Sequence, residues 1–446
     1  MNKNTAFYRN NQIFEYSFDA EHISTDGAIL LTKKIAQNSG LLISFSQEIP
    51  DKRDQSLIDF KLEDLVNQRV LMMMQGYEDC NDTEKLNHDP LIEAVLGNRL
   101  ASQPTLSRFE NSINKFTVYR LCHWYATRYV NSLSPGRKEI IIDVDLPAET
   151  AVQAGGTDDP THGQQQLSFY NGYYDTTMYM EVFFKDGHTG QVIVPLLLPG
   201  YYNSSRLFVA VLSRLVDMIR QKLPGVKIII RADGAYSNPG FYKLAHEKQL
   251  CYGIGLPSNP VLKKLIAPQE KFIREVIMPT GKALKCASLP FEYKAGTWEK
   301  PEQVYARFEA ISGRLDIRFI ASNMGKTLYD GNDLYWDFYA QRGEASENRI
   351  KEIKNMCYSD RLSCHNFWAN YFRLLLYCLC YELFRLIKVL IQKSGVKQAL
   401  KWQVDTIRLN LLKIGAWFKK TKRRVSIHFS QSFRYRELLN RLLQLT

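Results

Sequence analysis

The stretch Glu139-Ile-Ile-Ile-Asp143-Val-Asp145 is an apolar run that ends in acid. A second run of the same kind lies downstream and reads Val226-Lys-Ile-Ile-Ile-Arg-Ala-Asp233. Short runs of β-branched residues indicate buried strands, and a carboxylate just past such a strand lies at the rim of a sheet, where ligands collect. The two runs therefore predict central strands with acids at their carboxyl ends.

A third acid lies where a helix should begin, in Tyr339-Ala-Gln-Arg342-Gly-Glu-Ala-Ser-Glu347-Asn-Arg-Ile-Lys351-Glu-Ile-Lys354. A residue advances about 100° around a helix, so Glu347 and Lys354 share one face two turns apart. Two strand-end acids and one helical acid supply the oxygen ligands that a pair of divalent cations needs. The alternative is a solvated helix with Glu-to-Lys pairs four residues apart.

The elements between the two strand-end acids indicate the fold class. The sequence predicts strands over 177–184 and 191–198 joined by a turn, then a helix over about 205–222, and then the Asp233 strand. Strand, hairpin, helix and strand with acids on the first and fourth strands is the order of a ribonuclease-H-like α/β fold. The expected domains are a helical region over 1–135, a core over 136–255 and 324–395, a β-rich insertion over 256–323, and a helical, basic C-terminal region over 396–446.

Composition narrows the function further. The chain has 58 Lys and Arg against 46 Asp and Glu, which gives a net charge of +12 and favours a polyanionic partner. The eight cysteines show no metal-finger spacing, no signal peptide is recognised and no apolar segment suits a membrane span. The absence of P-loop, HExxH, GxSxG and GxGxxG patterns argues against ATPases, zinc proteases, hydrolases and dinucleotide-binding enzymes.

One basic run stands out near the C-terminus. Phosphate contact is the functional interpretation, and a solvated surface is the alternative. The run comprises Lys419, Lys420, Lys422, Arg423 and Arg424.

These motifs resemble those of the DDE transposases of bacterial insertion sequences, specifically the group called transposase DDE domain group 1. The signature of that wider set is Tyr-x2-Arg-x3-Glu-x6-Lys. Tyr339, Arg342, Glu347 and Lys354 fit it, except that four residues instead of three separate the arginine from the glutamate. Glu344 is the rival position, and it departs further from the signature because only one residue separates it from Arg342.

Further segments resemble the same group in the expected order along the chain. They are Gly76-Tyr-Glu-Asp-Cys-Asn-Asp, Gln103-Pro-Thr-Leu-Ser-Arg-Phe-Glu, Thr157-Asp-Asp-Pro-Thr-His-Gly163, Asp360-Arg-Leu-Ser-Cys-His-Asn and Leu411-Leu-Lys-Ile-Gly-Ala. The small-residue stretch 147–156 departs from the group's pattern, because in relatives the aspartate strand runs almost directly into the Thr157 segment.

The resemblance implies a site and a reaction. Asp145, Asp233 and Glu347 would be the catalytic acids and would hold two Mg²⁺ ions, for which Mn²⁺ would substitute. The reaction would be cleavage of double-stranded DNA at terminal inverted repeats and transfer of the 3′ ends to target DNA, by a homodimer in the bacterial cytoplasm near the nucleoid. The expected DNA contacts are Tyr339, Arg342, Lys351, Lys354 and the basic run, and the helical region over 1–135 would bind the ends of the element, with a structural scaffold as the alternative. The alternatives are a ribonuclease-H-like nuclease without strand transfer and an inactive DNA-binding derivative.

Two assignments near the first acid stay open on the sequence alone. Residues two apart on a strand share a face, so alternation cannot separate Asp143 from Asp145. We favour Asp145 because it lies nearer the strand end and the group's pattern, and we expect Asp143 to support the ligands from behind. His162 is a candidate for a supporting role or a DNA contact, with a structural role as the alternative.

Overall fold

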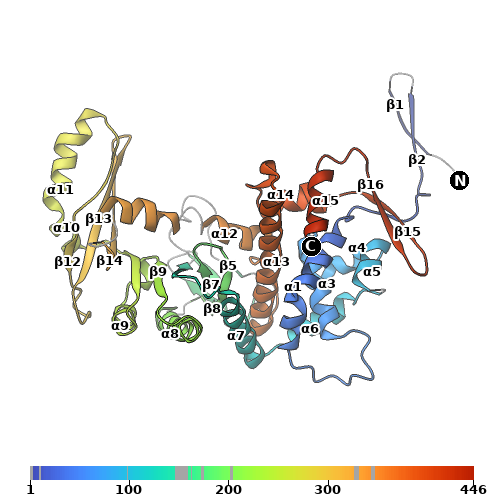
Figure 1. The fold of residues 1–446 in the computed structure, drawn as a ribbon, viewed down its shortest axis with the longest axis horizontal. Helices are drawn as coiled ribbons and strands as arrows, with labels where there is room; N and C mark the ends of the chain where they lie inside the picture. Colours follow the sequence, from blue (N-terminus) through green and yellow to red (C-terminus); the bar gives the residue numbers. More distant parts are fainter. Residues whose placement is uncertain are drawn as a thin grey trace. The chain divides into compact units, whose positions relative to one another are not determined.

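The computed structural model describes residues 4–9, 12–97, 99–145, 159–161, 163–171, 175–200, 204–325, 331–342 and 347–446; the side chains of 4–9, Asp145, Asp159, Ser204, Ser205 and Glu347 lie outside this description. The chain forms two compact units (Figure 1). Unit 1 comprises Met1–Ser112, Met356–Tyr358 and Leu379–Thr446, and unit 2 comprises Ile113–Asn355 and Ser359–Cys378.

A mixed sheet forms the centre of unit 2. Its five middle strands lie in the order β8 (Val192–Pro199), β7 (Thr176–Asp186), β4 (Glu139–Asp145), β9 (Lys227–Ala232) and β10 (Cys251–Leu256). β7 pairs antiparallel with β4 and β8, and β9 pairs parallel with β4 and β10. The predicted order of strand, hairpin, helix and strand is therefore confirmed.

Helices make the connections that parallel pairing requires. α8 (Ser204–Lys222) joins β8 to β9, and α9 (Pro239–Glu247) joins β9 to β10. Asn238 caps α9 by accepting the N–H of Phe241 at 3.0 Å, and Pro239 occupies its first turn, where a missing N–H costs nothing. The helix predicted over 205–222 is confirmed.

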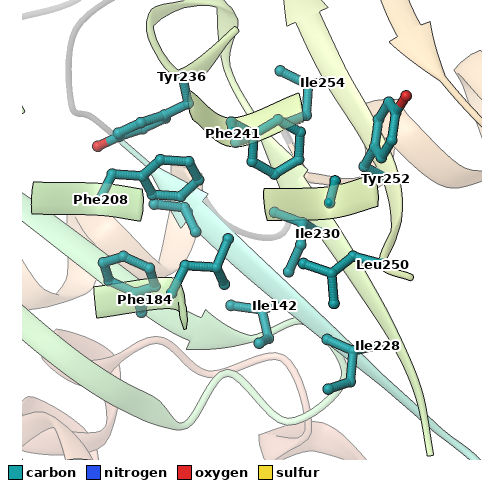
Figure 2. Packing of buried hydrophobic residues seen from close by; sticks show 14 of the residues in the cluster. Ile142, Phe184, Phe208, Ile228, Ile230, Tyr236, Phe241, Leu250, Tyr252 and Ile254 are labelled. Atoms are coloured by element: carbon teal, nitrogen blue, oxygen red, sulfur yellow. The ribbon is translucent and has the colours of Figure 1, made fainter. Parts of the chain in front are cut away.

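Alternate residues of the central strands face opposite sides, and both sides are covered. Ile142 and Ile230 belong to the larger apolar cluster, which includes Phe208 of α8 and Phe241 of α9 (Figure 2). On the other side, Ile141 packs in a second cluster with residues of the irregular helix η5 (Asp333–Tyr339). Burial on both sides explains why each strand reads as a continuous apolar run.

A buried ion pair follows the apolar residues on the second side. The carboxylate of Asp143 accepts two hydrogen bonds from Arg231, at 2.6 Å from Nε and 2.9 Å from Nη2. A third nitrogen of Arg231 donates to the carbonyl of Phe338 at 2.9 Å. Only 1% of Asp143 and 3% of Arg231 is exposed, so each charge depends on the other for its stabilisation.

The stretch 256–323 extends the same sheet beyond β10. β14 (Arg314–Ser322) pairs antiparallel with β10, and β13 (Glu302–Ile311) pairs with β14, with β11 (Leu284–Ala287) and β12 (Phe291–Tyr293) paired to β13. The short helices α10 (Pro260–Leu265) and α11 (Ala267–Phe272) precede them. On β7, the short strands β5 (Asp159–Pro160) and β6 (Phe169–Asn171) also pair. The expected β-rich stretch is thus a continuation of the central sheet.

Unit 1 is mainly helical. Its helices are α1 (Ile29–Ser39), α2 (Leu41–Gln47), α3 (Leu62–Met74), α4 (Thr83–Leu86), α5 (Pro90–Leu96), α6 (Gln103–Asn111), α14 (Val404–Ile407) and α15 (Arg436–Leu445). The long helix α13 (Phe367–Ser394) has its first residues in unit 2 and the rest in unit 1. No helix in the described ranges is long and apolar enough to cross a membrane.

Strands also occur in unit 1, so the expectation of helical terminal regions is met only in part. β1 (Asn4–Arg9) pairs with β2 (Gln12–Tyr16), and β15 (Ala416–Lys420) pairs with both β16 (Val425–Phe429) and β3 (Ile23–Ser24). The pairing of β3 with β15 joins opposite ends of the chain, which local patterns cannot reveal. α7 (Lys115–Ser132) belongs to unit 2, and the compact units divide after Ser112. That the DNA-end-binding region ends near residue 135 stays a prediction.

We expect Asp143→Asn to lower the free energy of unfolding by about 3–5 kcal/mol, because it leaves the buried Arg231 guanidinium without a compensating charge. Urea denaturation measures the effect. The matched control is Glu299→Gln, which breaks the exposed Lys243–Glu299 pair at 3.7 Å and should cost less than about 1 kcal/mol. Equal effects of the two variants would contradict the structural role of the Asp143 pair.

Candidate active site

The register of β4 and β9 brings two of the predicted acids together. The parallel pairs run from Glu139↔Lys227 to Val144↔Ala232, and one further step in this register sets Asp145 opposite Asp233. Neighbouring strands lie about 4.8 Å apart, so the two positions are adjacent at the carboxyl ends of the central strands.

Asp233 is fixed by the turn that follows β9. It caps the short helix η2 (Gly234–Tyr236), where its Oδ1 accepts the N–H of Ala235 at 2.9 Å. Only 2% of the residue is exposed. A carboxylate fixed in this way at a strand end is well placed to hold a cation.

Of the two aspartates on β4, Asp143 already has a partner for its charge. Both of its carboxylate oxygens accept hydrogen bonds from Arg231. Asp145 lies two residues further along the strand, at its end. The geometry therefore agrees with Asp143 as a supporting residue and leaves Asp145 as the candidate ligand.

The third acid begins a helix. Glu347 is the first residue of α12 (Glu347–Lys351), which continues into the irregular turn η7 (Glu352–Met356). Arg349 attaches α12 to the turn after β7, because its guanidinium donates to the carbonyls of Gly187 at 3.2 Å and His188 at 3.3 Å. The buried residues Ile350 and Ile353 form the inner side of the helix.

Tyr339 packs against the strand end that carries Asp233. Its hydroxyl donates to the carbonyl of Ala232 at 3.3 Å. A Cβ at Gly255 of β10 would lie 2.7 Å from the Tyr339 oxygen and 2.9 Å from the backbone nitrogen of Gly234, so only glycine fits there. Tyr339 is thus held between the ends of β9 and β10, in a position to fix the Asp233 turn.

The two basic residues of the signature, Arg342 and Lys354, and the nearby Lys351 lie in different surroundings. The Arg342 guanidinium lies over the ring of Tyr339, 5.5 Å from its centroid, and Lys351 is exposed on α12. Lys354 is only 3% exposed. Of these three, Lys351 has the open surface that a direct phosphate contact needs, whereas Lys354 is covered.

The charge of Lys354 interacts with that of a buried acid on β7. Glu181 is fully buried, and its Oε2 accepts a hydrogen bond from Ser359 at 3.2 Å. Burial raises the pKa of Glu181 to about 7, against the opposing effects of the positive charge of Lys354 and the Ser359 hydrogen bond. Asp360 adds a smaller effect that also raises this pKa.

The basic run of the C-terminal region lies in unit 1. Its residues occupy the exposed tip of the hairpin formed by β15 and β16, around a turn in which Thr421 and Arg424 exchange hydrogen bonds. All five side chains, those of Lys419, Lys420, Lys422, Arg423 and Arg424, are exposed.

The chemistry of the donors suits magnesium. The acids at these positions offer only oxygen ligands, which Mg²⁺ prefers, and two of them come from adjacent strand ends. Among the described side chains no group of three His, Cys, Asp or Glu residues could hold a metal, but the side chains of Asp145 and Glu347 are not among them. His162, Glu344 and the stretch 147–156 also lie outside the described residues.

Sequence reasoning missed three side chains that shape the site. Arg231 has a detectable signal, because it stands two residues before Asp233 just as Asp143 stands two before Asp145. Glu181 interrupts the otherwise apolar stretch from Met178 to Phe184, which also marks it. Arg349 carries no such signal, since a basic residue on a helix is ordinarily solvated.

The comparisons with known proteins concern the whole chain. No curated protein matches it. Among solved structures it is similar to a piggyBac transposase in a synaptic complex with hairpin DNA, at 13% identity and a TM-score of 0.43, over 86% of this chain and 79% of that chain. The sequence model of the family described as transposase DDE domain group 1 matches residues 8–446. This match spans nearly the whole chain, and the chain therefore belongs to the transposase DDE domain group 1 family.

Proposed function

We propose that this transposase cuts DNA at the terminal inverted repeats of its own element and transfers the 3′ ends to target DNA. The observation that carries the proposal is the register of β4 and β9, which sets Asp145 beside Asp233 at the carboxyl ends of the central strands. Membership in the DDE family supports it, and the resemblance to the family's motifs implies Asp145, Asp233 and Glu347 as the three acids.

The middle of the sheet supports a ribonuclease-H-like core. Three antiparallel strands, β8, β7 and β4, are followed by β9 and β10, which run parallel to β4. In chain order, Asp145 ends β4, the first of these strands, and Asp233 follows β9, the fourth. Glu347 begins a helix later in the chain. We assign the core on this order of elements.

Asp145, Asp233 and Glu347 would hold two Mg²⁺ ions. When bound, the ions would activate a water and later the 3′-hydroxyl as nucleophile and stabilise the leaving oxygen. The chain itself fixes the positions of the acids. The turn of η2 holds Asp233, the Asp143–Arg231 pair supports the strand end behind Asp145, and Arg349 anchors the helix that begins at Glu347.

Of the residues in and beside the signature, some would contact DNA and others would act within the protein. Lys351 is exposed and would contact phosphate, and Arg342, stacked on Tyr339, would do so beside the scissile bond. Tyr339 would orient the Asp233 turn through its bond to Ala232. Lys354 would act from within the protein, because it is buried and its charge opposes that of Glu181.

The partner would be double-stranded DNA, both the ends of the element and the target. Net charge and the exposed basic tip of the β15–β16 hairpin support this partner. Pairing two ends would require a homodimer.

Two alternatives differ in the reaction. A ribonuclease-H-like nuclease would cut but would not join the 3′ ends, and a strand-transfer assay separates it from the proposal. An inactive DNA-binding derivative would bind ends without cutting, and metal-dependent cleavage by the wild-type protein would exclude it.

Asp233→Asn and Glu347→Gln should each reduce cleavage by more than about 100-fold while end binding persists. An amide keeps the shape of the side chain but removes the charge that the metal requires, and loss of supporting residues alone costs about 10–100-fold. The measurement is cleavage of a plasmid that carries the element's ends, in Mg²⁺. Glu344→Gln is the matched control and should cut normally; loss of activity in that variant alone would move the third ligand to Glu344.

The contribution of Glu181 to stability should depend on pH. The pKa of Glu181 is about 7 in the folded protein, against 4.5 for an exposed glutamate. Protonated Glu181 therefore contributes its full share of stability below pH 4.5, and the wild-type protein loses this contribution as pH rises from 4.5 to 7. Relative to wild type, Glu181→Gln should therefore gain roughly 3 kcal/mol of stability between pH 4.5 and 7. Urea denaturation across this range measures it.

The control for this pH series is Glu299→Gln, which alters an acid whose side chain is 65% exposed. Its stability relative to wild type should change little over the same range, because the side chain is already hydrated in the folded protein. A constant difference between Glu181→Gln and wild type would contradict the burial of the Glu181 charge.

Replacement of the five basic residues at the hairpin tip by alanine should weaken duplex binding and flatten its salt dependence. Each lost phosphate contact reduces the slope of log K against log salt by about 0.9, so the change should reach about 4.5 if all five residues contact DNA. Fluorescence anisotropy with a labelled duplex at several salt concentrations measures the slope. Exchange of lysine for arginine and arginine for lysine at the same positions should preserve it, and an unchanged slope in the alanine variant would identify the run as a solvated surface.

A further inference from the structure

The three-stranded sheet of unit 1 has one face turned outward. β15 lies between β16 and β3, with Trp417 opposite His428 on one side and opposite Ile23 on the other. Residues that pair directly across neighbouring strands point to the same face of the sheet, so these three residues form one row across it. We call this row, Ile23, Trp417 and His428, the outer row.

The outer row is exposed although its members are largely apolar. Trp417 is 47% exposed and Ile23 is 53% exposed, and His428 is exposed as well. The rings of Trp417 and His428 lie 4.8 Å apart and are tilted by 38°. Exposed apolar side chains gathered in one place mark an interaction site more often than isolated ones do.

The opposite face of the sheet anchors it. Phe418, the next residue along β15, is only 1% exposed and packs in an apolar cluster with Ile29, Met72 and Ile92 of the helices. The inner face therefore holds the hairpin on unit 1, and its outer row is presented on a fixed support.

Basic residues lie next to the outer row, at the tip of the hairpin formed by β15 and β16. The hairpin 416–429 contains five basic residues and no acid, and in the part of the chain that the structure describes no carboxylate pairs with any of the five. Lys419 follows Trp417 by two residues on the same strand, which places it roughly 7 Å further along the same face. The surface thus combines aromatic rings with unneutralised positive charge.

We propose that the outer row is a stacking platform for unpaired DNA bases, with the basic tip binding the phosphates of the same strand. Aromatic rings on a sheet beside a basic groove bind single strands because every base offers a π-face, whatever the sequence. Bases within a duplex have both faces covered by their neighbours, so the platform selects unpaired nucleotides. The proposal rests on the proposed function for its DNA partner and adds to it a second class of contact.

The test compares a fluorescein-labelled 20-nucleotide oligothymidine with a labelled 20-base-pair duplex, by anisotropy over a range of salt. Trp417→Ala should weaken oligothymidine binding by roughly 5- to 100-fold and leave duplex binding within about twofold. The salt slope should stay unchanged, because no charge is removed. Trp417→Phe retains a ring and should restore most of the affinity.

Two controls make the result specific to the platform. Leu409→Ala truncates another exposed apolar side chain of unit 1, 72% exposed, and should change neither affinity. Circular dichroism of each variant checks that the fold is intact. Wild-type tryptophan fluorescence should fall on adding oligothymidine, and Trp417→Phe should lose that fall.

The outcomes separate this inference from the proposed function. Wild-type affinity of Trp417→Ala for oligothymidine would overturn the platform while duplex binding and cleavage stood. Equal weakening for both DNAs would also overturn it, because the row would then contact duplex DNA. A wild-type protein that binds neither DNA would contradict the proposed function as well.

Discussion

Parallel pairing between β4 and β9 is the constraint on which the site depends. On the side of the sheet that faces η5, both strands have the same order of residues. An isoleucine comes first, then one partner of the Asp143–Arg231 ion pair, and then a candidate metal ligand. A shift of one residue would turn every side chain to the other face of the sheet. The register that buries the isoleucines on that face is therefore also the one that aligns the acids.

The ion pair between Asp143 and Arg231 sits between the apolar core and the acids. Desolvation of two charges costs several kcal/mol for each ion, so such a pair is a poor source of net stability. Its two-pronged geometry, with a third bond to Phe338, nevertheless distinguishes the correct register from a shifted one. We interpret it as a device that fixes the strand ends before any metal binds.

Much of this arrangement could be predicted from the sequence, and the reasons are specific. The strands of Asp145 and Asp233 are continuous apolar runs because helices cover both faces, and α8 has a clear helical pattern. The pairing of β3 with β15 could not be predicted, since two residues at one end of the chain carry no strand pattern of their own. The burial of Lys354 was also hidden, because its neighbour Glu181 lies far away in the sequence on β7.

The continuation of the sheet beyond β10 has a consequence for the integrity of the core. Along Gly253–Leu256, the backbone groups of β10 that face away from β9 are occupied by β14. Without the stretch 256–323, β10 would become an edge strand with unpaired N–H and C=O groups, beside the Asp233 turn. Such edges invite pairing with other chains and aggregation. The stretch thus protects the core from misassembly, and the chain cannot be shortened there without supplying another cover.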